Sequence, residues 1–321
     1  MQVYEVGNPD VMKWEEVDPG SPGEDQVLVR HTVVGLNFID VYFRTGVYPP
    51  PGFPFVPGLE GAGVVEQVGA AVSDLSVGDR VAYASPPLGA YAELRLMPAD
   101  RLVRIPDSVD DETAAAMMLK GMTAQYLLRQ VYKVGASDTI LFHAAAGGVG
   151  LIACQWAKSL GATVIGTVGS EEKADLARQH GCDHPIIYTR EDFTERVREI
   201  TNGKGVPVVY DSVGLSTFEK SLDCLSPKGL MVSFGQSSGG VESFNPVVLS
   251  AKGSLFLTRP TLMTYTAERE DLVMMADELC DMVTTGAVGI PVRQRFALED
   301  AVEAHRSLES RATQGATVLV V

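Results

Sequence analysis

Short apolar runs alternate with stretches of helical periodicity through the middle of the chain. After residue 110 the pattern predicts helices over 111–119 and 121–131, followed by strands and helices in turn. The predicted strands cover residues 139–143, 163–168, 184–188, 206–210 and 229–234. Repeated βαβ units with short apolar strands are typical of a parallel sheet covered by helices on both faces. The middle of the chain therefore predicts a doubly wound α/β domain.

The first 110 residues favour strands instead. Patterns at 26–35, 61–69 and 89–97 are typical of strands. Residues 42–57, between the first two, are rich in proline, glycine and aromatic side chains, a composition too stiff and irregular for a core strand. Loops of that length in compact domains are often binding loops. A helix over 267–285 and a strand over 316–321 complete the predicted elements.

The composition is that of an ordinary globular protein large enough for two domains. The 321 residues are 45% hydrophobic and 21% charged, and no apolar run approaches the roughly 20 residues that span a bilayer. The N-terminus has neither the basic region nor the apolar core of a signal peptide. The net charge of −15 disfavours nucleic acid or an anionic membrane as a partner, although a local cluster of cations can still bind a small anionic cofactor.

The four cysteines, Cys154, Cys182, Cys224 and Cys280, include no C-x-x-C pair. Their spread suggests buried free thiols in a reducing compartment, which predicts a cytoplasmic protein. Cys182 and His184 come nearest to a metal-binding pair, and two ligands do not make a site. We therefore expect no metal.

The segment TILFHAAAGGVG, residues 139–150, runs from a predicted strand through a glycine-rich turn into a predicted helix. A dinucleotide-binding fingerprint requires this context, because free backbone N–H groups and the positive dipole end of the helix attract a pyrophosphate. Gly147 would let the backbone approach the phosphates, and Gly150 would let the helix pack close to the strand. Ala145 stands in place of the first glycine of the fingerprint, so the motif alone leaves open a glycine-rich turn without a ligand.

The segment after the second predicted strand favours NADP(H) over NAD(H). Folds that prefer NAD place Asp or Glu at the end of that strand, where it holds the ribose hydroxyls. Here residues 163–168 are followed by Gly169 and Ser170, and Lys173 comes soon after. A small, open turn with a nearby lysine suits a 2′-phosphate, although a lysine at this position could also simply solvate a helix face.

With these residues in view, the chain resembles the quinone oxidoreductase, or zeta-crystallin-like, branch of the medium-chain dehydrogenase/reductase superfamily. The similarity covers nearly the whole chain, and alanine at position 145 is usual for this branch. The matching segments are GLNFIDVY (35–42), PGLEGAG (57–63), GDRV (78–81), HAAAGGVG (143–150), YDSVG (210–214), MVSFG (231–235) and ESRATQG (309–315). So many ordered matches are far more specific than one glycine loop.

The resemblance implies an α/β fold with two domains. Residues 1–120 and 260–321 would form a GroES-like, β-rich catalytic and substrate domain, and residues 121–259 would form a doubly wound, parallel-sheet Rossmann domain for NADP(H). The active site would lie in the cleft between them, in agreement with the rule that ligands bind at the carboxyl ends of strands and at domain interfaces.

The resemblance also implies that catalysis is independent of zinc. Zinc-dependent relatives carry Cys where this chain has Asn37 and His where it has Leu59, and neither Asn nor Leu is a ligand that zinc prefers. The cysteine-rich structural zinc loop is missing as well. The natural reaction is then reduction of an acceptor that needs little Lewis-acid help, such as a quinone or an activated enone.

By the same resemblance, Asn37, Tyr42 and Tyr48 are the candidate catalytic residues, with Tyr42 as hydrogen-bond donor to the substrate oxygen. Tyr48 would equally suit the packing of its loop. Gly169, Lys173 and Tyr188 would form the 2′-phosphate pocket, and residues 234–237 would close over the nicotinamide amide. In chain order, the candidate cofactor-binding residues are Phe38, Thr123, Gly147, Gly148, Val149, Gly150, Gly169, Lys173, Tyr188, Phe234, Gly235, Gln236, Ser237, Arg259 and Arg311.

The resulting hypothesis is an NADPH:quinone oxidoreductase that acts on small quinones. An NADPH-dependent enone or enal reductase remains open, because both reactions use the same hydride geometry. A non-catalytic NADPH-binding protein, structural or RNA-binding, is a third alternative, and the net charge of −15 argues against RNA. A homodimer is also implied, with the strand edge around residues 254–258 as a place where the sheet could continue into a partner.

Overall fold

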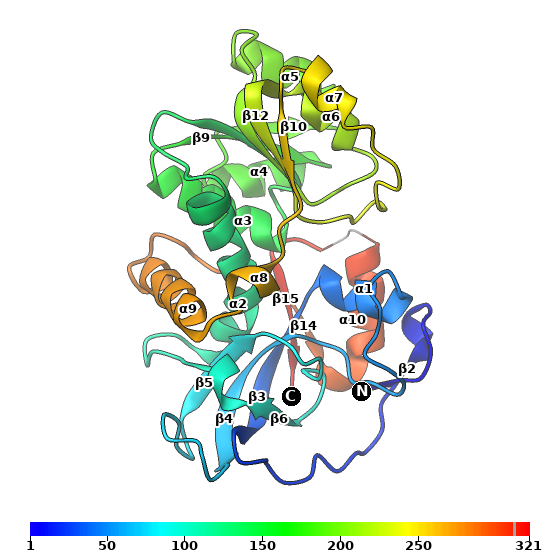
Figure 1. Ribbon diagram of the computed structural model, residues 1–321, viewed down its shortest axis with the longest axis vertical. Helices are drawn as coiled ribbons and strands as arrows, with labels where there is room; N and C mark the ends of the chain where they lie inside the picture. The colour runs from blue at the N-terminus through cyan, green and yellow to red at the C-terminus, as the bar shows by residue number, and fades with distance from the viewer. Residues whose placement is uncertain (311–312) are drawn as a thin grey trace. The chain divides into compact units, whose positions relative to one another are not determined.

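The protein divides into two compact units. The computed structural model describes residues 1–310 and 313–321, and Figure 1 shows its elements coloured along the chain. The first unit comprises Met1–Met122, Thr266–Thr284 and Ile290–Val321, and the second comprises Thr123–Tyr265 and Thr285–Gly289. Among the described residues, no helix has both the length and the apolar character needed to cross a membrane.

Six parallel strands form the sheet of the second unit (Figure 1). In sheet order they are β10 (His184–Ile187), β9 (Thr163–Val168), β8 (Thr139–Phe142), β11 (Val206–Asp211), β12 (Leu225–Ser233) and β13 (Phe256–Thr258). The chain order reverses between β8 and β11, which is the doubly wound arrangement of a dinucleotide-binding fold. Ligands of such sheets bind beyond the carboxyl ends of the strands at this reversal, so the segments after β8 and β11 are the ones to inspect.

Helices follow most of these strands, as the alternating pattern predicts. They are α3 (Gly148–Ser159), α4 (Glu171–Gln179), α5 (Phe193–Ile200), α6 (Phe218–Asp223), α7 (Val247–Ala251) and α8 (Leu262–Tyr265). Leu141, Ile165 and Met231 from the strands form one buried core with Phe193 of α5 and Leu222 of α6. Because helices cover the sheet, its inner strands β8, β9 and β11 are buried over almost their whole length.

One helix differs from the prediction. α2 (Asp111–Tyr126) continues through residue 120, where the sequence suggested a break, and ends in a single π-helical turn, Leu127–Val131. Gly121, the first residue of the second predicted helix, serves packing inside α2, because a Cβ atom there would lie 2.5 Å from Cδ1 of Leu279 on α9 (Arg269–Thr284). A glycine inside a helix costs about 1 kcal/mol relative to alanine, and here it allows close packing against α9.

The first unit is built on a mainly antiparallel sheet. In sheet order its strands are β14 (Val292–Ala297), β15 (Ala316–Val320), β3 (Gln26–Leu36), β4 (Glu60–Val68), β5 (Arg80–Ala84) and β7 (Val103–Arg104), and β6 (Leu94–Pro98) also pairs with β3. β15 is parallel to β14 and antiparallel to β3. The smaller elements are β1 (Gln2–Val3), β2 (Met12–Lys13), α1 (Phe38–Thr45) and α10 (Ala301–Glu309), with 3-10 turns at Pro9–Val11, Ala99–Arg101 and Leu298–Asp300.

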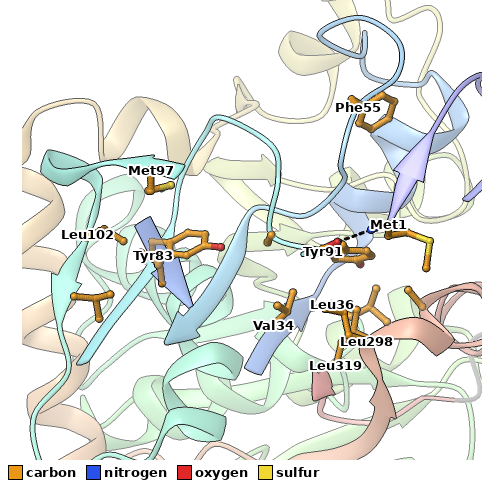
Figure 2. Packing of buried hydrophobic residues seen from close by; sticks show 14 of the residues in the cluster. Met1, Val34, Leu36, Phe55, Tyr83, Tyr91, Met97, Leu102, Leu298 and Leu319 are labelled. Carbon is orange, nitrogen blue, oxygen red and sulfur yellow. Dashed lines mark hydrogen bonds between the residues drawn. The ribbon is translucent and has the colours of Figure 1, made fainter. Parts of the chain in front are cut away.

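Figure 2 shows the apolar core of this unit. Val34 of β3, Tyr83 of β5 and Leu319 of β15 are fully buried in it. The amino group of Met1 donates to the carbonyl oxygen of Tyr91 over 2.9 Å, which ties β1 to the same core. The core therefore joins strands from both ends of the chain.

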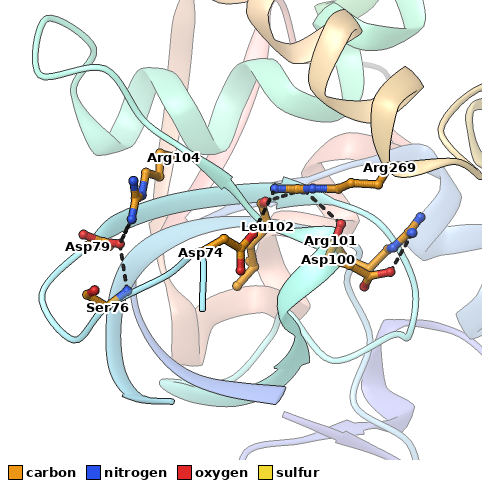
Figure 3. A network of polar contacts seen from close by, with 8 residues as sticks. All are labelled: Asp74, Ser76, Asp79, Asp100, Arg101, Leu102, Arg104 and Arg269. Atoms are coloured by element: carbon orange, nitrogen blue, oxygen red, sulfur yellow. Dashed lines mark hydrogen bonds and ion pairs between the residues drawn. The ribbon is translucent and has the colours of Figure 1, made fainter. Parts of the chain in front are cut away.

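On the surface of the first unit, arginines hold turns in place (Figure 3). Arg104 of β7 donates to Asp79 over 2.8 Å, in the turn before β5. Arg269, the first residue of α9, donates to the carbonyl oxygens of Asp100 and Leu102 over 2.9 and 2.6 Å. Exposed ion pairs contribute little to stability, so these contacts mainly fix the position of β7 and the turn before it against α9.

A buried chain of polar groups links α1 to α10. The hydroxyl of Tyr91 donates to Oδ2 of Asp40 over 3.0 Å and lies 3.0 Å from Nε2 of His305, whose Nδ1 lies 3.2 Å from a guanidinium nitrogen of Arg44. Arg44 also pairs with Glu309 over 2.7 Å. Burial, together with the charge of Arg44, lowers the pKa of His305 to about 3, so the imidazole is neutral. Burial raises the pKa of Asp40 to about 7.

The raised pKa of Asp40 predicts that the difference in stability between Asp40→Asn and the native protein changes with pH. An unfolded aspartate releases its proton near pH 3.8, whereas folded Asp40 keeps it until about pH 7, so the native protein loses stability over this interval as the pH rises. Asp40→Asn cannot ionise, and its carbonyl oxygen can still accept from Tyr91. We expect the free energy of unfolding of the variant to rise relative to that of the native protein by up to about 4 kcal/mol over this interval, and then to stay level.

Urea unfolding of both proteins at a series of pH values measures this difference. Asp74→Asn, which removes an exposed carboxylate of the same unit, corrects for the loss of one surface charge. Parallel stability curves for Asp40→Asn and the native protein would show that Asp40 does not hold its proton in the folded state.

Candidate functional site

The glycine-rich loop between β8 and α3 brings the helix into direct contact with the loop backbone. Ala144 adopts a left-handed conformation (φ 54°), and its carbonyl oxygen accepts from the N–H of Gly147 over 2.9 Å. A Cβ atom on Gly150 would lie 2.8 Å from the backbone of Ala145 and would also collide with the carbonyl oxygen of Ala144. Glycine at position 150 is therefore required for the first turn of α3 to lie on this loop.

Ala145 fits at the position of the first fingerprint glycine because a glycine faces it. A Cβ atom on Gly166 of β9 would lie 2.6 Å from Cβ of Ala145 and 2.7 Å from Sγ of Cys182. The absent side chain on the neighbouring strand thus provides the space for the alanine methyl group. The departure from the fingerprint does not disturb the loop.

The N-terminus of α3 suits an anionic group. Gly147 is its N-cap residue in an extended conformation (φ −80°, ψ 174°), and a Cβ atom there would meet only the carbonyl oxygen of Ala144, at 3.1 Å. The first N–H groups of a helix have no acceptor within it, and glycine has no side chain to cap them. The backbone at Gly148, Val149 and Gly150 therefore offers donors at the positive end of a 12-residue helix. This arrangement fits a pyrophosphate.

The segment after β9 has no carboxylate at the strand end. Val168 is followed by Gly169 and Ser170, whose hydroxyl oxygen accepts from the backbone N–H of Lys173 over 3.3 Å and so begins α4. The side chain of Tyr188 lies over this turn, because a Cβ atom on Gly169 would come within 2.9 Å of its hydroxyl oxygen. Gly169, Lys173 and Tyr188 thus lie together in one half-exposed region.

Asp211, the last residue of β11, organises the next loop. One carboxylate oxygen accepts from the N–H groups of Val213 and Gly214 over 2.7 and 3.0 Å. The other accepts from the hydroxyls of Thr217 and Ser221 over 2.7 and 2.9 Å. Four donors surround a carboxylate that is completely buried, and they fix the backbone at the point where the strand order reverses.

Residues 234–237 lie against that loop. The N–H of Phe234 donates to the last carbonyl of β11 over 2.8 Å, and the N–H of Ser237 donates to the next carbonyl over 3.2 Å. Arg259, just after β13, donates to the carbonyl of Gly235 over 2.8 Å and lies 3.4 Å from Oε1 of Gln236. The structure therefore gathers these five predicted residues at the carboxyl ends of β11, β12 and β13.

His143, the first residue after β8, is hydrogen-bonded to residues next to the same loops. Its ring nitrogens lie 2.8 Å from Oγ1 of Thr167 and 2.9 Å from Oγ of Ser221. Burial lowers the pKa of His143, so its ring is neutral. Since the Ser221 hydroxyl donates to Asp211, it cannot also donate to His143. These hydrogen bonds join the end of β8 to β9 and α6. They do not form the nucleophile and base of a hydrolytic triad.

Aromatic side chains cluster on and after α1 in the first unit. The ring centroids of Phe38 and Tyr42 are 6.3 Å apart, and those of Tyr42 and Tyr48 are 5.2 Å apart with an edge-to-face geometry. The N–H of Tyr48 donates to the carbonyl of Tyr42 over 3.0 Å, so the loop returns to the helix at this point. Phe43 contacts Tyr48 as well, at 5.7 Å.

Asn37, the N-cap residue of α1, lies against a buried ion pair. Its N–H donates to Oδ2 of Asp40 over 2.9 Å, and its Nδ2 donates to Oε2 of Glu60 over 2.7 Å. Lys120 donates to the same Glu60 oxygen over 3.0 Å, and the N–H of Leu119 donates to the other over 2.7 Å. The sequence interpretation missed this pair. A signal was present, because Lys120 is the one charged residue in the apolar stretch 117–122, and lysine is rarely buried without a partner.

Within residues 1–310 and 313–321, no cluster of three or more His, Cys, Asp or Glu side chains could hold a metal ion. Leu59 is buried, and the amide of Asn37 is bound to Glu60.

The predicted site residues fall into separate groups. Asn37, Phe38, Tyr42 and Tyr48 lie together on and around α1. In the second unit, the predicted glycines and their neighbours lie at the ends of β8 and β9, and residues 234–237 lie with Arg259. Thr123 is buried on α2, the helix whose Leu119 and Lys120 donate to Glu60. Arg311 is outside the described residues.

Known proteins resemble this chain over its whole length. A family model of the alcohol dehydrogenase GroES-like domain matches residues 23–107, and one of zinc-binding dehydrogenases matches residues 148–277. A quinone oxidoreductase of Pseudomonas aeruginosa is 55% identical over 320 residues, which cover 100% of this chain and 98% of the relative. A 2-haloacrylate reductase of a Burkholderia species is 48% identical, covering 99% and 97%. The crystal structure of Escherichia coli quinone oxidoreductase complexed with NADPH has a TM-score of 0.98 at 48% identity, covering 100% of this chain and 99% of that one.

The fold and the matching domains define a medium-chain dehydrogenase/reductase, and the chain belongs to the quinone oxidoreductase branch of that superfamily. The resemblance inferred from the motifs is confirmed. So is the predicted fold class, a GroES-like β-rich domain with a doubly wound Rossmann domain.

Two glycine substitutions in the loop separate folding from ligand binding. Gly150→Ala should lower the free energy of unfolding by about 2 kcal/mol, because its methyl group collides with backbone that cannot move aside. Gly147→Ala should cost less stability than Gly150→Ala, because its methyl group would meet only the carbonyl oxygen of Ala144, at 3.1 Å, and it should weaken NADPH binding by about tenfold or more, because the methyl group stands at the N-cap of α3. Thermal unfolding and fluorescence titration with NADPH measure the two effects. A folded Gly147→Ala protein with native NADPH affinity would show that the loop does not bind the pyrophosphate.

Proposed function

We propose that this protein is a zinc-independent NADPH:quinone oxidoreductase that transfers a hydride from NADPH to small quinones. The proposal rests on a glycine-rich loop at the reversal of strand order, together with the absence of a carboxylate at the end of β9. The chain that carries them is 55% identical over its whole length to a curated quinone oxidoreductase. The E. coli relative that was solved with NADPH supports the choice of cofactor.

The residues of the second unit hold the cofactor in this proposal. NADPH, when bound, supplies the hydride from its nicotinamide ring. The N–H groups at the start of α3 bind the pyrophosphate, and Lys173, with Gly169 and Tyr188, binds the 2′-phosphate. Thr123, residues 234–237 and Arg259 bind toward the nicotinamide end, and Arg311 is assigned there by family resemblance alone.

The residues around α1 bind and orient the substrate. Phe38, Tyr42 and Tyr48 provide an aromatic cluster whose ring faces and edges suit contact with a planar quinone ring. The hydroxyl of Tyr42 donates a hydrogen bond to the substrate oxygen, where negative charge develops as the hydride arrives. Asn37 contributes its side-chain amide to the same end. The assignment of residues 1–120 and 260–321 to the substrate and of 121–259 to the cofactor is part of this proposal.

A second reaction is favoured by one specific similarity. The Burkholderia 2-haloacrylate reductase is 48% identical to this chain, the same value as for the E. coli quinone oxidoreductase 1. An activated carbon–carbon double bond accepts a hydride in the same way as a quinone and places negative charge on a conjugated oxygen. We therefore include reduction of enones and activated acrylates as an alternative activity of the same site.

We also propose a homodimer in the cytoplasm. β13 is the edge strand of its sheet, and Phe256 on it is 62% exposed, an unusual position for a large apolar side chain on an unpaired edge. A second copy that continued the sheet would cover it. The four cysteines are buried free thiols, which suits a reducing compartment.

Loss of absorbance at 340 nm tests the main proposal, with NADPH or NADH as donor and 1,4-benzoquinone as acceptor. We expect rapid oxidation of NADPH, slower oxidation of NADH and no effect of a chelator. Lys173→Ala should reduce the NADPH preference by about ten- to a hundredfold, because it removes one charge-assisted contact to the phosphate.

Arg178→Ala, on an exposed arginine of the same helix, is the matched control and should keep the preference. Tight NADPH binding without reduction of any quinone or acrylate would leave a cofactor-binding protein and refute the enzymatic proposal. A faster rate with 2-chloroacrylate than with quinones would favour the alternative reaction.

Phe256→Asp tests the dimer. A charge on the edge strand should block continuation of the sheet, so the variant should sediment as a monomer at micromolar concentration where the native protein is a dimer. Met274→Asp, which places the same charge on an exposed apolar residue of α9, is the control. A native protein that sediments as a monomer would refute the proposal.

A further inference from the structure

Lys120 and Glu60 form a buried ion pair directly against Asn37. The ammonium group lies 3.0 Å from Oε2 of Glu60, and Nδ2 of Asn37 donates to that same oxygen over 2.7 Å. The Lys120 side chain is 7% exposed and that of Glu60 is completely buried. A buried pair of this kind adds little net stability, because desolvation of two charges costs about as much as their attraction contributes. Stability alone therefore does not account for it.

The chain is shaped around this carboxylate. A Cβ atom on Gly35 of β3 would collide with Oε2 of Glu60 and with the carbonyl oxygen of Ala115, so only glycine leaves room for the carboxylate. The backbone N–H of Leu119 donates to the second Glu60 oxygen over 2.7 Å. Groups from β3, β4 and α2 thus hold Glu60 in one position.

The charge of Glu60 determines which way the Asn37 amide faces. An ionised carboxylate can only accept hydrogen bonds, so it must face the NH₂ group of the amide and not its oxygen. One N–H is then held by Glu60, and Oδ1 and the second N–H point elsewhere. A protonated Glu60 could instead donate to Oδ1 and would tolerate the amide turned by half a rotation.

We propose that the Lys120–Glu60 pair positions Asn37 for the reaction, by keeping Glu60 ionised and so fixing the orientation of the Asn37 amide. The proposal rests on the proposed function only in that Asn37 lies at the substrate end. Lys120 and Glu60 touch neither substrate nor cofactor in this role, and they are positioning residues.

Other ionisable groups near Glu60 do not replace the lysine. Asp40 on α1, Tyr83 on β5 and Tyr91 are close enough to interact electrostatically with Glu60. Burial raises the pKa of all three, and none carries positive charge. The remaining ionisable neighbours contact the two tyrosines and not Glu60. His31 is hydrogen-bonded to Tyr83, and Cζ of Arg95 lies 4.6 Å from the centre of the Tyr83 ring. Arg44 interacts with Tyr91.

Removal of the ammonium should make the orientation of Asn37 depend on pH. In Lys120→Met, Glu60 is a buried carboxylate without a counter-charge, which raises its pKa. Above that pKa the carboxylate is ionised and Asn37 is held as in the native protein. Below it Glu60 is protonated and the amide can turn. Activity of this variant should therefore fall as the pH falls, with a new acid limb that the native enzyme lacks.

The kinetic experiment compares the native enzyme with Lys120→Met, Lys120→Arg and the double variant Lys120→Met/Glu60→Gln. NADPH oxidation with 1,4-benzoquinone is measured between about pH 5 and about pH 9. We expect kcat of Lys120→Met to fall by about ten- to a hundredfold at the acid end, with a smaller change in KM. Lys120→Arg keeps the charge and should lack the acid limb. The double variant should lose the limb, because glutamine does not titrate, and its kcat should stay low at every pH, because the glutamine NH₂ group can donate to Oδ1 and lets the Asn37 amide turn as protonated Glu60 does.

Side-chain amide resonances give a readout that does not depend on activity. In protein labelled with ¹⁵N-asparagine, the Asn37 side-chain signal is identified by its loss in Asn37→Ala. Asp40, which accepts from the Asn37 N–H and titrates at about pH 7, contributes the same shift in every variant. We expect no further shift in the native protein and in the double variant, and an additional shift with pH in Lys120→Met. Lys158→Met, which removes an exposed ion-paired lysine of the second unit, is the control and should match the native protein.

The outcomes separate the two proposals. An acid limb and a moving Asn37 signal in Lys120→Met, both abolished in the double variant, support positioning. Native pH profiles in all variants, with losses that follow thermal stability, would overturn it. So would a double variant that keeps the acid limb of Lys120→Met. If the native enzyme reduces no quinone, the proposed function fails, while the Asn37 resonance still tests whether the pair orients the amide.

Discussion

The acidic side chains of Asp40, Glu60 and Asp211 are completely buried, and each accepts hydrogen bonds from the groups around it, with Oδ1 of Asp40 left without a partner among the described residues. A buried carboxylate without such partners would destabilise the fold by several kcal/mol, so the backbone around each is constrained to supply them. Around Asp211, those donors fix the loop at the sheet reversal of the second unit. Around Glu60 and Asp40, they fix Asn37 and the start of α1. In each unit, the segments that carry the candidate functional residues are thus held by a polar group in the interior.

The repeating pattern of the chain predicted the fold better than it predicted the site. Each apolar run from 139 to 234 corresponds to a strand of the parallel sheet, because strands buried on both faces leave a clear signal in sequence. The prediction failed where glycine had two explanations. Gly121 lies inside α2, where it leaves room for Leu279. Gly89 was expected to begin a strand, but it lies in a turn. The N–H groups of residues 89 and 90 donate to the carbonyl oxygen of Gly58, and β6 begins only at residue 94.

The glycine loop and the open end of β9 could be found from sequence because their chemistry lies in adjacent residues. The pair of Lys120 and Glu60 could not, because 60 residues separate its partners along the chain. Asp211 and its partners lie close in sequence, but polar residues after a strand look like an ordinary loop until their burial is known. The choice of substrate is equally hard to predict from sequence, because the chain is 48% identical both to a quinone oxidoreductase and to a 2-haloacrylate reductase. Substrate choice depends on a few contacts that composition and periodicity do not reveal.

The place of β15 in the first unit has a consequence for how the protein is made. This strand lies between β14 and β3, so it completes a sheet whose central strand is synthesised long before it. The strands of the second unit, in contrast, all precede residue 259. The second unit's sheet can therefore form during synthesis, whereas residues 33–36 of β3 must wait for β15 before that part of the edge is paired. We expect chaperones to bind the chain during this delay, and slower translation between β13 and β15 to lengthen it.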